Sequence, residues 1–492
     1  MSVDTNNAAF QDALNLIQYT RQSVFLTGKA GTGKSTFLRY VCENTKKKHV
    51  VLAPTGIAAI NAGGSTMHSF FKLPFYPLLP DDPNLSLQRG RIHEFFKYTK
   101  PHRKLLEQIE LVIIDEISMV RADIIDAIDR ILRVYSHNLR EPFGGKQLLL
   151  VGDVFQLEPV VKNDEREILN RFYPTPYFFS ARVFGQIDLV SIELQKVYRQ
   201  TDPVFVGVLD HIRNNTAGAA DLQLLNTRYG SQIEESEADM YITLATRRDT
   251  VDSINEKKLA ELPGDPITFE GVIEGDFPES SLPTSQELVL KPGAQIIFIK
   301  NDFDRRWVNG TIGVIAGIDE EEETIYVITD DGKECDVKRE SWRNIRYRYN
   351  EKTKEIEEEV LGSFTQYPIR LAWAITVHKS QGLTFSRVVI DFTGGVFAGG
   401  QAYVALSRCT SLDGIQLKKP INRADVFVRP EIVNFAGRFN DRQAIDKALK
   451  QAQADVQYAA ASRAFDKGDM EECLEQFFRA IHSRYDIEKP VP

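Results

Sequence analysis

Short apolar runs alternate with helix-like segments over the first 193 residues. The runs VFLT, HVVLAPT, LVIIDEI, KQLLLVGD and DLVSIEL are rich in Val, Ile and Leu, as is typical of strands buried on both faces. Strands that alternate with helices predict a parallel sheet with helices on both sides. A second segment of this kind occupies residues 194–289 and 363–430. We therefore expect an α/β protein with two parallel-sheet domains in tandem.

The interruption within the second segment has a different pattern. Over residues 290–362, the short alternating runs AQIIFI, GTIGVIAGI, ETIYVITD and KECDVKRE are separated by NG, DEEEE and DDG turn signals. This pattern predicts a small antiparallel barrel inserted into the second domain. At its end, RNIRYRY interleaves Arg with Tyr. It fits either a strand with alternating faces or a surface that pairs with phosphates and stacks on bases.

Two further segments depart from the alternation of strands and helices. Residues 71–105 are rich in Pro and Asp, which disfavours a sheet strand and indicates an insertion in the first domain. Residues 431–492 have a helical pattern and resemble one tetratricopeptide repeat. Because about three repeats are needed to bury their apolar faces, this extension is either a helical hairpin docked on the core or a partner-binding module.

Composition narrows the class of protein. No apolar run approaches the roughly 20 residues of a membrane-spanning helix, and the N-terminus lacks the pattern of a secretion signal. The four cysteines lie far apart, without metal-ligand or disulfide spacing. These features predict a cytoplasmic protein with no membrane partner. The net charge of −9 excludes a uniformly basic surface but not local basic patches that bind nucleic acid.

The segment VFLTGKAGTGKST, residues 24–36, carries the strongest chemical signal. It contains Gly28-x-x-x-x-Gly33-Lys34-Ser35 between a predicted strand and a predicted helix, as a phosphate-binding loop requires. The glycines let backbone N–H groups surround phosphate oxygens at the positive end of the helix. Lys34 is expected to reach the β- and γ-phosphates, and the Ser35 hydroxyl to bind Mg²⁺. The pattern predicts a nucleoside triphosphatase.

Polar residues follow two other predicted strands, at the edge where strand ends line a ligand crevice. Asp115 and Glu116 end LVIIDEI, and Gln156 follows KQLLLVGD. Asp115 can hold Mg²⁺ through water, Glu116 can deprotonate the attacking water, and Gln156 can contact that water or a γ-phosphate. Arg199 in LQKVYRQ and Arg408 in YVALSRCT are either arginine fingers from beyond the first domain or surface ion-pair partners.

These motifs together resemble those of a helicase family. The segments in helicase order are GKAGTGKST, APTGIAAINAGGSTMHSFF, VIIDEISMV, GDVFQLEPV, LQKVYRQ, QYPIRLAWAITVHKSQGLTF and GQAYVALSRCTSLDGI. Over residues 8–425 the chain resembles superfamily 1B DNA helicases of the Pif/RecD-like family, closest to the Pif branch. The resemblance implies two RecA-like domains, an SH3-like barrel insertion, and a duplex-splitting wedge near Phe75 and Tyr76.

The resemblance places ATP and Mg²⁺ between the two RecA-like domains. Gln11 resembles the adenine-reading glutamine, although AAFQDAL departs from the usual acidic-Gln pair. Ser35 and Asp115 are the implied Mg²⁺ residues. The other implied nucleotide residues are Gly31, Thr32, Gly33, Lys34, Thr36 and Gly382, and the implied catalytic residues are Lys34, Glu116, Gln156, Arg199 and Arg408.

The resemblance also implies single-stranded DNA and single/double-strand junctions as partners. Hydroxyl, imidazole and backbone N–H groups at loop tips bind phosphates without reading sequence. Without the family resemblance, Thr55 and Ser380 would be interpreted as helix N-caps, and His68 as a buried group. The implied DNA contacts are Thr55, Gly56 and His68 in the first domain, and His378, Lys379 and Ser380 in the second.

The implied activity is ATP-dependent unwinding with 5′→3′ movement on single-stranded DNA, extending to forked duplexes and G-quadruplexes. Two alternatives are a translocase that remodels protein–DNA complexes with little unwinding, and a non-enzymatic scaffold. The second conflicts with the intact Lys34, Asp115 and Glu116. We expect a monomer, with dimerisation on DNA as the alternative.

Overall fold

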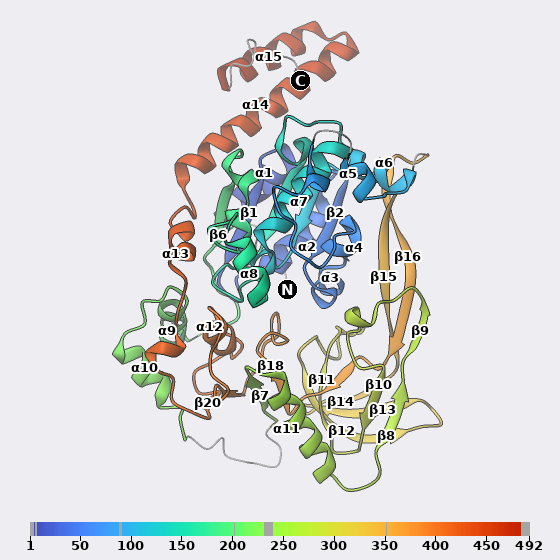
Figure 1. Ribbon diagram of the computed structural model, residues 1–492, viewed down its shortest axis with the longest axis vertical. Coiled ribbons are helices and arrows are strands. Elements are labelled where there is room, and N and C mark those ends of the chain that lie inside the picture. The colour runs from blue at the N-terminus through green and yellow to red at the C-terminus, as the bar shows by residue number, and fades with distance from the viewer. Residues whose placement is uncertain are drawn as a thin grey trace.

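Figure 1 shows the computed structural model, which describes residues 4, 7–87, 91–200, 202–230, 240–350 and 352–483. One α/β region forms the upper body of the molecule. A second α/β region lies below it at the left, and an antiparallel β region lies below at the right (Figure 1). Nowhere in the described ranges does a helix combine the length and apolar character needed to cross a bilayer.

The upper region is built on a six-stranded sheet whose neighbouring strands are all parallel. In spatial order the strands are β3 (Ser65–Thr66), β2 (His49–Ala53), β4 (Leu111–Ile114), β5 (Gln147–Val151), β1 (Val24–Gly28) and β6 (Val190–Leu194). Along β1, Phe25 belongs to one apolar core, whereas Val24 and Leu26 belong to another. Both faces of the sheet are therefore buried, as the continuous apolar runs predict.

Helices cover both faces of this sheet (Figure 1). They include α1 (Ala8–Tyr19), α2 (Lys34–Asn44), α3 (Gly56–Ala62), α4 (Met67–Phe71), α5 (Arg91–Phe95), α6 (Lys100–Gln108), α7 (Ala122–Tyr135) and α8 (Asn163–Leu169). Leu78, Leu85 and Ile92 of the Pro-rich insertion belong to the apolar core that contains Phe25. Phe75 of the same insertion is 83 % exposed. Its chain is thus anchored at several points around an exposed aromatic tip.

The second α/β region contains a four-stranded parallel sheet. Its strands, in spatial order, are β18 (Ala374–Thr376), β7 (Ile242–Ala245), β19 (Val388–Asp391) and β20 (Ile415–Leu417). Its helices include α9 (Pro203–Arg213), α10 (Ala219–Asn226), α11 (Arg248–Glu261) and α12 (Gln401–Leu406). Two parallel-sheet regions in tandem confirm the predicted fold class.

The antiparallel region is larger than the sequence pattern indicates. Its main sheet runs β14 (Glu334–Val337), β13 (Thr324–Thr329), β12 (Ile312–Asp319), β11 (Gln295–Phe298) and β17 (Ile369–Leu371). A two-stranded sheet of β8 (Ile267–Glu270) and β10 (Glu287–Leu290) packs on it, because Phe269 and Leu288 share its core. The region therefore begins near residue 267, whereas the pattern predicts a start at 290.

The RNIRYRY segment lies in a long hairpin that reaches up to the first domain (Figure 1). The hairpin consists of β15 (Glu340–Asn350) and β16 (Glu355–Gln366), with β9 (Val272–Gly275) at its edge. Tyr347 is 6 % exposed, and its hydroxyl accepts a hydrogen bond from the Val51 N–H at 3.3 Å. Arg346 lies on the opposite face and pairs with Glu359 at 2.7 Å. The alternating-face interpretation is confirmed, and Tyr347 is not free to stack on bases.

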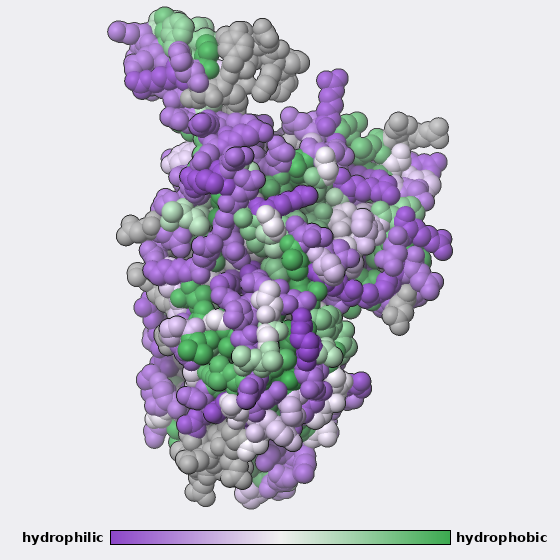
Figure 2. Space-filling model, turned by 90° about the vertical axis from the view of Figure 1, so that its left-hand side faces the viewer, coloured by the Kyte–Doolittle hydropathy of each residue, from purple (hydrophilic) through white to green (hydrophobic). Residues whose placement is uncertain are grey.

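The C-terminal helices are α13 (Pro430–Ala436), α14 (Arg442–Lys467) and α15 (Met470–Ser483). Phe435, Ile445 and Ala448 pack into the cores of the first domain. The outer half of α14 and α15 form a hairpin that projects from the body (Figure 1). This hairpin carries a hydrophobic area beside a hydrophilic one (Figure 2), with Leu474 and Phe478 more than half exposed. The segment from 430 to 449 thus completes the first domain, and only the hairpin stands apart.

Candidate nucleotide and DNA site

The predicted nucleotide residues meet because β4, β5 and β1 are neighbours in one parallel sheet. Their carboxyl ends lie at the same edge, where ligands bind in open α/β sheets. The phosphate-binding loop follows β1, Asp115 and Glu116 follow β4, and Gln156 follows β5. The fold therefore brings together side chains separated by more than a hundred residues.

The loop has the backbone that a phosphate cradle requires. Gly31 and Gly33 have φ angles of 79° and 89°, a region that side chains other than glycine rarely adopt. The Lys34 ammonium donates hydrogen bonds to the carbonyl oxygens of Gly28 at 2.7 Å and Lys29 at 3.0 Å. Burial lowers the pKa of Lys34, which Asp153 and Glu116 partly offset. The Lys34 ammonium is thus held against carbonyl groups of the loop itself.

Several predicted loop residues lie in or beside the first turn of α2. Thr32 is buried and donates to the Lys29 carbonyl at 2.9 Å, so it shapes the loop. Ser35 is exposed and Thr36 is half-buried. Gln11 lies on α1, which packs on α2 through Phe10 and Phe37 with ring centroids 4.8 Å apart. The helix that carries Gln11 therefore lies beside the helix that follows the loop.

Asp115 and Glu116 form a half-buried acidic pair at the end of β4. Burial raises the pKa of Asp115. Burial and the charge of Asp115 raise the pKa of Glu116 to about 7, against the opposing effect of Lys34. Glu116 also has a left-handed backbone, with φ 49° and ψ 42°. Such a conformation is costly for a residue other than glycine and is often found at functional sites.

Gln156 lies where the two parallel-sheet regions touch. It is 7 % exposed, and its N–H donates to the Asp153 carbonyl at 2.9 Å. A Cβ added to Gly400 would lie 2.2 Å from the Gln156 carbonyl oxygen. The second region therefore approaches this loop so closely that only glycine fits at position 400. Gln156 is therefore in direct contact with the residue that precedes α12.

The two predicted finger arginines also meet at this boundary. Arg408 is 1 % exposed, and its guanidinium donates to the carbonyls of Val404 at 3.0 Å and Ser380 at 3.3 Å. Arg199 donates to the Ser407 carbonyl at 3.4 Å. Burial and Arg199 lower the pKa of Arg408 to about 9. Within the described ranges, both guanidiniums donate to carbonyl or hydroxyl oxygens and neither forms an ion pair with a carboxylate.

Arg199 comes from a different place than the sequence indicates. The last strand of the first sheet, β6, ends at Leu194, and Arg199 lies five residues further along the chain. A Cβ added to Gly31 would lie 2.4 Å from the Arg199 Cβ, so Arg199 lies directly against the phosphate-binding loop. Its guanidinium reaches toward the second domain, where the Gly382 carbonyl accepts at 3.5 Å. Arg199 therefore spans the boundary, whereas Arg408 belongs to the second domain.

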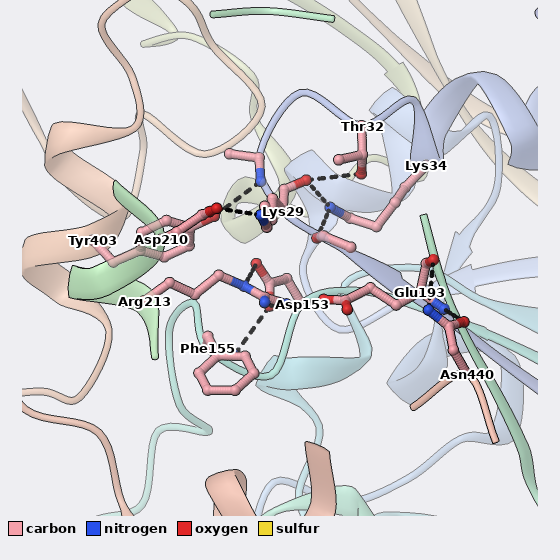
Figure 3. Close-up of polar contacts among 12 residues, drawn as sticks. Lys29, Thr32, Lys34, Asp153, Phe155, Glu193, Asp210, Arg213, Tyr403 and Asn440 are labelled. Atoms are coloured by element: carbon pink, nitrogen blue, oxygen red, sulfur yellow. Dashed lines mark hydrogen bonds and ion pairs between the residues drawn. The ribbon is translucent and has the colours of Figure 1, made fainter. Parts of the chain in front are cut away.

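A partly buried polar junction joins the domains beside the loop (Figure 3). Lys29 pairs with Asp210 of α9, and the Ala30 N–H donates to the Tyr403 hydroxyl of α12 at 3.0 Å. Arg213 of α9 bridges Asp153 at 3.1 Å and Glu193 at 2.9 Å. These contacts tie the second domain to the carboxyl ends of β1, β5 and β6 in the first domain.

We expect Arg213→Met to destabilise the protein by about 3–5 kcal/mol, because it leaves the buried Asp153 without its counter-charge. Urea unfolding followed by tryptophan fluorescence measures the change. The double variant Arg213→Met/Asp153→Asn is the matched control and should recover part of the loss. If the Arg213→Met variant is as stable as the wild type, the pair contributes little to stability.

The predicted DNA contacts of the first domain lie at two short helices. Thr55 is the N-cap of α3 and accepts from the Ala58 N–H at 3.2 Å. A Cβ added to Gly56 would lie 2.6 Å from the Ser281 hydroxyl oxygen, so a loop of the antiparallel region is seated on this glycine. His68 stacks on Phe75 with ring centroids 4.9 Å apart.

The predicted DNA contacts of the second domain differ in accessibility. His378 is half-buried, and burial lowers the pKa of its imidazole, whereas Lys379 is exposed. Ser380 is fully buried, and its hydroxyl donates to the Val377 carbonyl at 2.7 Å. Because the Ser380 carbonyl accepts from Arg408, Ser380 links this loop to the nucleotide site and presents no surface of its own.

Comparison with known proteins identifies the family. The model of the PIF1-like helicase family matches residues 4–211. The chain is 33 % identical over 412 residues to the ATP-dependent DNA helicase Pif1 of Campylobacter jejuni, covering 80 % of this chain and 88 % of that protein. The chain belongs to the PIF1-like helicases. Its relative from Bdellovibrio bacteriovorus is 31 % identical over 439 residues and carries the same name. The chain is thus an ATP-dependent DNA helicase by family.

Two solved helicase structures resemble the chain with different TM-scores. The crystal structure of Bacteroides sp Pif1 in complex with ADP-AlF4 has a TM-score of 0.81 at 41 % identity, covering 89 % of this chain and 97 % of that one. Bacteroides Pif1 bound to ssDNA has a TM-score of 0.64 at the same identity, covering 90 % and 99 %. At equal sequence identity, the TM-score is therefore lower for the structure bound to ssDNA.

The sequence analysis does not predict three residues that form the polar junction between the domains. Asp210 and Arg213 lie on an ordinary amphipathic helix, α9, and carry no motif. Tyr403 lies within a motif but has the pattern of a core residue, and it is indeed 4 % exposed. Only the approach of the two domains reveals that its hydroxyl contacts the phosphate-binding loop. A signal for Asp210 and Arg213 would have to come from three-dimensional pairing.

Proposed function

We propose that this helicase couples ATP hydrolysis in the interdomain cleft to 5′→3′ movement along single-stranded DNA and thereby unwinds duplexes, including forks and G-quadruplexes. The observation that carries the proposal is the pair Arg199 and Arg408. Arg408 is buried and Arg199 is half-buried, and among the described residues their guanidiniums donate only to carbonyl and hydroxyl oxygens. The charge of Arg199 acts on Lys34, and that of Arg408 acts on Glu116. Cations held in this way are stabilised by an anion, and the γ-phosphate of ATP is the anion that belongs beside Lys34.

The roles of the acidic side follow from the geometry. Glu116 would take the proton of the attacking water, and Gln156 would orient that water or contact the γ-phosphate. The raised pKa of Glu116 suits a general base near neutral pH. Arg199 and Arg408 would stabilise the charge that develops on the transferred phosphoryl group.

The residues also fit Mg²⁺. Asp115 is a half-buried carboxylate whose raised pKa a cation would reverse, and the Ser35 hydroxyl is exposed at the same loop. Within the described ranges, no cluster of three His, Cys, Asp or Glu residues could hold a metal alone. This suits Mg²⁺, which binds through few protein groups together with nucleotide phosphates and water. Bound Mg²⁺ would neutralise phosphate charge during hydrolysis.

The arrangement of the domains supports a mechanical cycle. Gly400 touches Gln156, and Tyr403 touches Ala30, so changes in the nucleotide site would move the second domain. The conformation is closer to that of the relative in complex with ADP-AlF4 than to that of the ssDNA-bound relative. We infer that DNA binding rearranges the antiparallel region, whose loop is seated on Gly56 at the predicted DNA contact.

A strand-displacement assay tests the proposal. We expect displacement of a 5′-tailed duplex, none of a 3′-tailed duplex, and loss of both displacement and ATP hydrolysis in Lys34→Ala. Hydrolysis stimulated by DNA without displacement would favour the alternative of a translocase that remodels protein–DNA complexes. Displacement of only the 3′-tailed duplex would contradict the polarity. Sedimentation with and without the tailed DNA checks the expectation of a monomer.

A further inference from the structure

One buried arginine of the second domain contacts the turn that carries Gln156, although it belongs to no sequence motif. Arg213 is the last residue of α9 and is 3 % exposed. Its guanidinium donates hydrogen bonds to both carboxylate oxygens of Asp153, at 3.1 and 3.3 Å. It also lies over the ring of Phe155, 4.3 Å from the ring centroid. Figure 3 shows the guanidinium between these two side chains, so Arg213 contacts the turn at two points.

Hydrogen bonds within the turn connect these contacts to Gln156. The Asp153 carboxylate accepts a hydrogen bond from the Phe155 N–H at 3.2 Å, and the Asp153 carbonyl accepts one from the Gln156 N–H at 2.9 Å. The carboxylate that Arg213 holds therefore belongs to the residue that fixes the backbone of Gln156. Gly400 of the second domain contacts the Gln156 carbonyl as well. The second domain thus holds this turn at separate places.

The contacts of Arg213 differ from those of the two finger arginines. Its guanidinium pairs with Asp153 at 3.1 Å and with Glu193 at 2.9 Å. Against the effect of burial, these two carboxylates raise the pKa of Arg213. Arg199 and Arg408 donate instead to carbonyl and hydroxyl oxygens. Arg213 already has its anionic partners within the protein, so its contacts point to the turn and not to the nucleotide.

Asp153 lies close enough to the nucleotide site to act on its charged groups. Burial lowers the pKa of Lys34, and the charge of Asp153 is the largest effect that opposes it. Asp153 itself is 1 % exposed, and a carboxylate buried to that degree needs a counter-charge at a fixed place. Arg213 supplies that charge from the second domain. The position of the turn therefore depends on where the second domain lies.

We propose that Arg213 is a positioning residue for ATP hydrolysis, which holds the turn after β5 so that the Gln156 amide meets the attacking water or the γ-phosphate. The inference rests on the proposed function, which gives Gln156 that role, and it adds the group that fixes the amide. A displacement of about 1 Å at a reacting centre can cost about 100-fold in rate. Because Arg213 belongs to the second domain, the amide is fixed only while the two domains are in contact. Hydrolysis is thereby tied to that arrangement.

A double-mutant cycle between Arg213 and Gln156 tests the inference. Arg213→Lys keeps the positive charge but not the planar pair of donors that holds Asp153. The kcat of DNA-stimulated hydrolysis should fall by about 10- to 100-fold, with little change in the KM for ATP. In the Gln156→Ala background the same substitution should have almost no further effect, because the amide that it positions is already gone. Glu193→Gln is the matched control, since it weakens the other ion pair of Arg213 and should keep the wild-type kcat.

The outcomes separate this inference from the proposed function. If Gln156→Ala hydrolyses ATP as fast as the wild type, the role of Gln156 in the proposed function is contradicted, and the inference fails with it. If Gln156→Ala is slow and Arg213→Lys slows hydrolysis by the same factor in both backgrounds, only the inference is overturned. A Glu193→Gln variant as slow as Arg213→Lys would also overturn it, because a loosened junction would then explain both.

A second substitution in the turn makes the test independent of the stability of Arg213→Lys. Phe155→Leu removes the ring beside the guanidinium and leaves both ion pairs of Arg213 in place. Its effect on kcat should also disappear in the Gln156→Ala background, whereas an equal effect in both backgrounds would contradict the positioning role. The unfolding midpoint in urea shows that the variants compared are folded under the assay conditions.

Discussion

Replacing Arg408 by alanine should leave ATP binding intact while slowing DNA-stimulated hydrolysis by at least about 10³-fold. Arg408 is the most deeply buried cation of the cleft, and its donors reach only carbonyl and hydroxyl oxygens. The γ-phosphate would become its first anionic partner. Because charge develops on that phosphate during transfer, the loss should fall on the rate of turnover and not on affinity.

Two measurements decide the matter for Arg408. Steady-state hydrolysis with single-stranded DNA gives the turnover, and binding of a fluorescent ATP analogue shows whether the site is still formed. Arg438→Ala is a matched control at an exposed position and should behave as the wild type. Arg408→Lys should recover little, because a lysine cannot reproduce the planar set of donors. Normal turnover in the alanine variant removes the finger role.

Replacing Glu116 by glutamine should slow hydrolysis by about 10²–10⁴-fold, the usual contribution of a general base. Glutamine keeps the shape of the side chain but cannot accept a proton from water. ATP should bind at least as tightly, because the change removes a negative charge beside the phosphates. Single-turnover hydrolysis with excess enzyme isolates the chemical step.

The comparison with Asp115→Asn distinguishes base from metal residue. If Asp115 holds Mg²⁺, its variant should regain activity when Mg²⁺ is raised, whereas Glu116→Gln should not. Glu116→Gly offers a further check, because glycine relieves the left-handed backbone at this position. We expect Glu116→Gly to be as inactive as Glu116→Gln without being less stable. Activity in either Glu116 variant would assign the base elsewhere.

The sequence predicts the nucleotide side of this helicase well for a physical reason. Lys34, Glu116 and Gln156 each follow a short apolar run, and parallel strands bring their carboxyl ends to one edge. Local pattern and global fold therefore point to the same place. The DNA side is harder, because hydroxyl and imidazole groups such as Thr55 and His68 have structural partners of their own.

Local sequence patterns do not predict which residues of the two domains contact each other. Arg213 and Asp153 are sixty residues apart in the chain, and only the packed structure shows their ion pair. Tyr347 is a second example. Its alternation with arginines fits DNA binding as well as burial, and only the contact with Val51 in the folded structure shows that it is buried. The alternation predicts which side chains share a face of the strand, but not what packs against that face.

The return of the chain to the first domain has a consequence for how the protein is made. Phe435 and Ile445 fill cores that are otherwise formed largely by residues before 200, and the Asn440 side chain accepts from the Glu193 N–H at 2.8 Å. During synthesis, these residues leave the ribosome only after the whole second domain. The first domain described here can therefore close its core only after the second domain has been translated, so nascent chains carry an open apolar surface until residues 435–448 emerge.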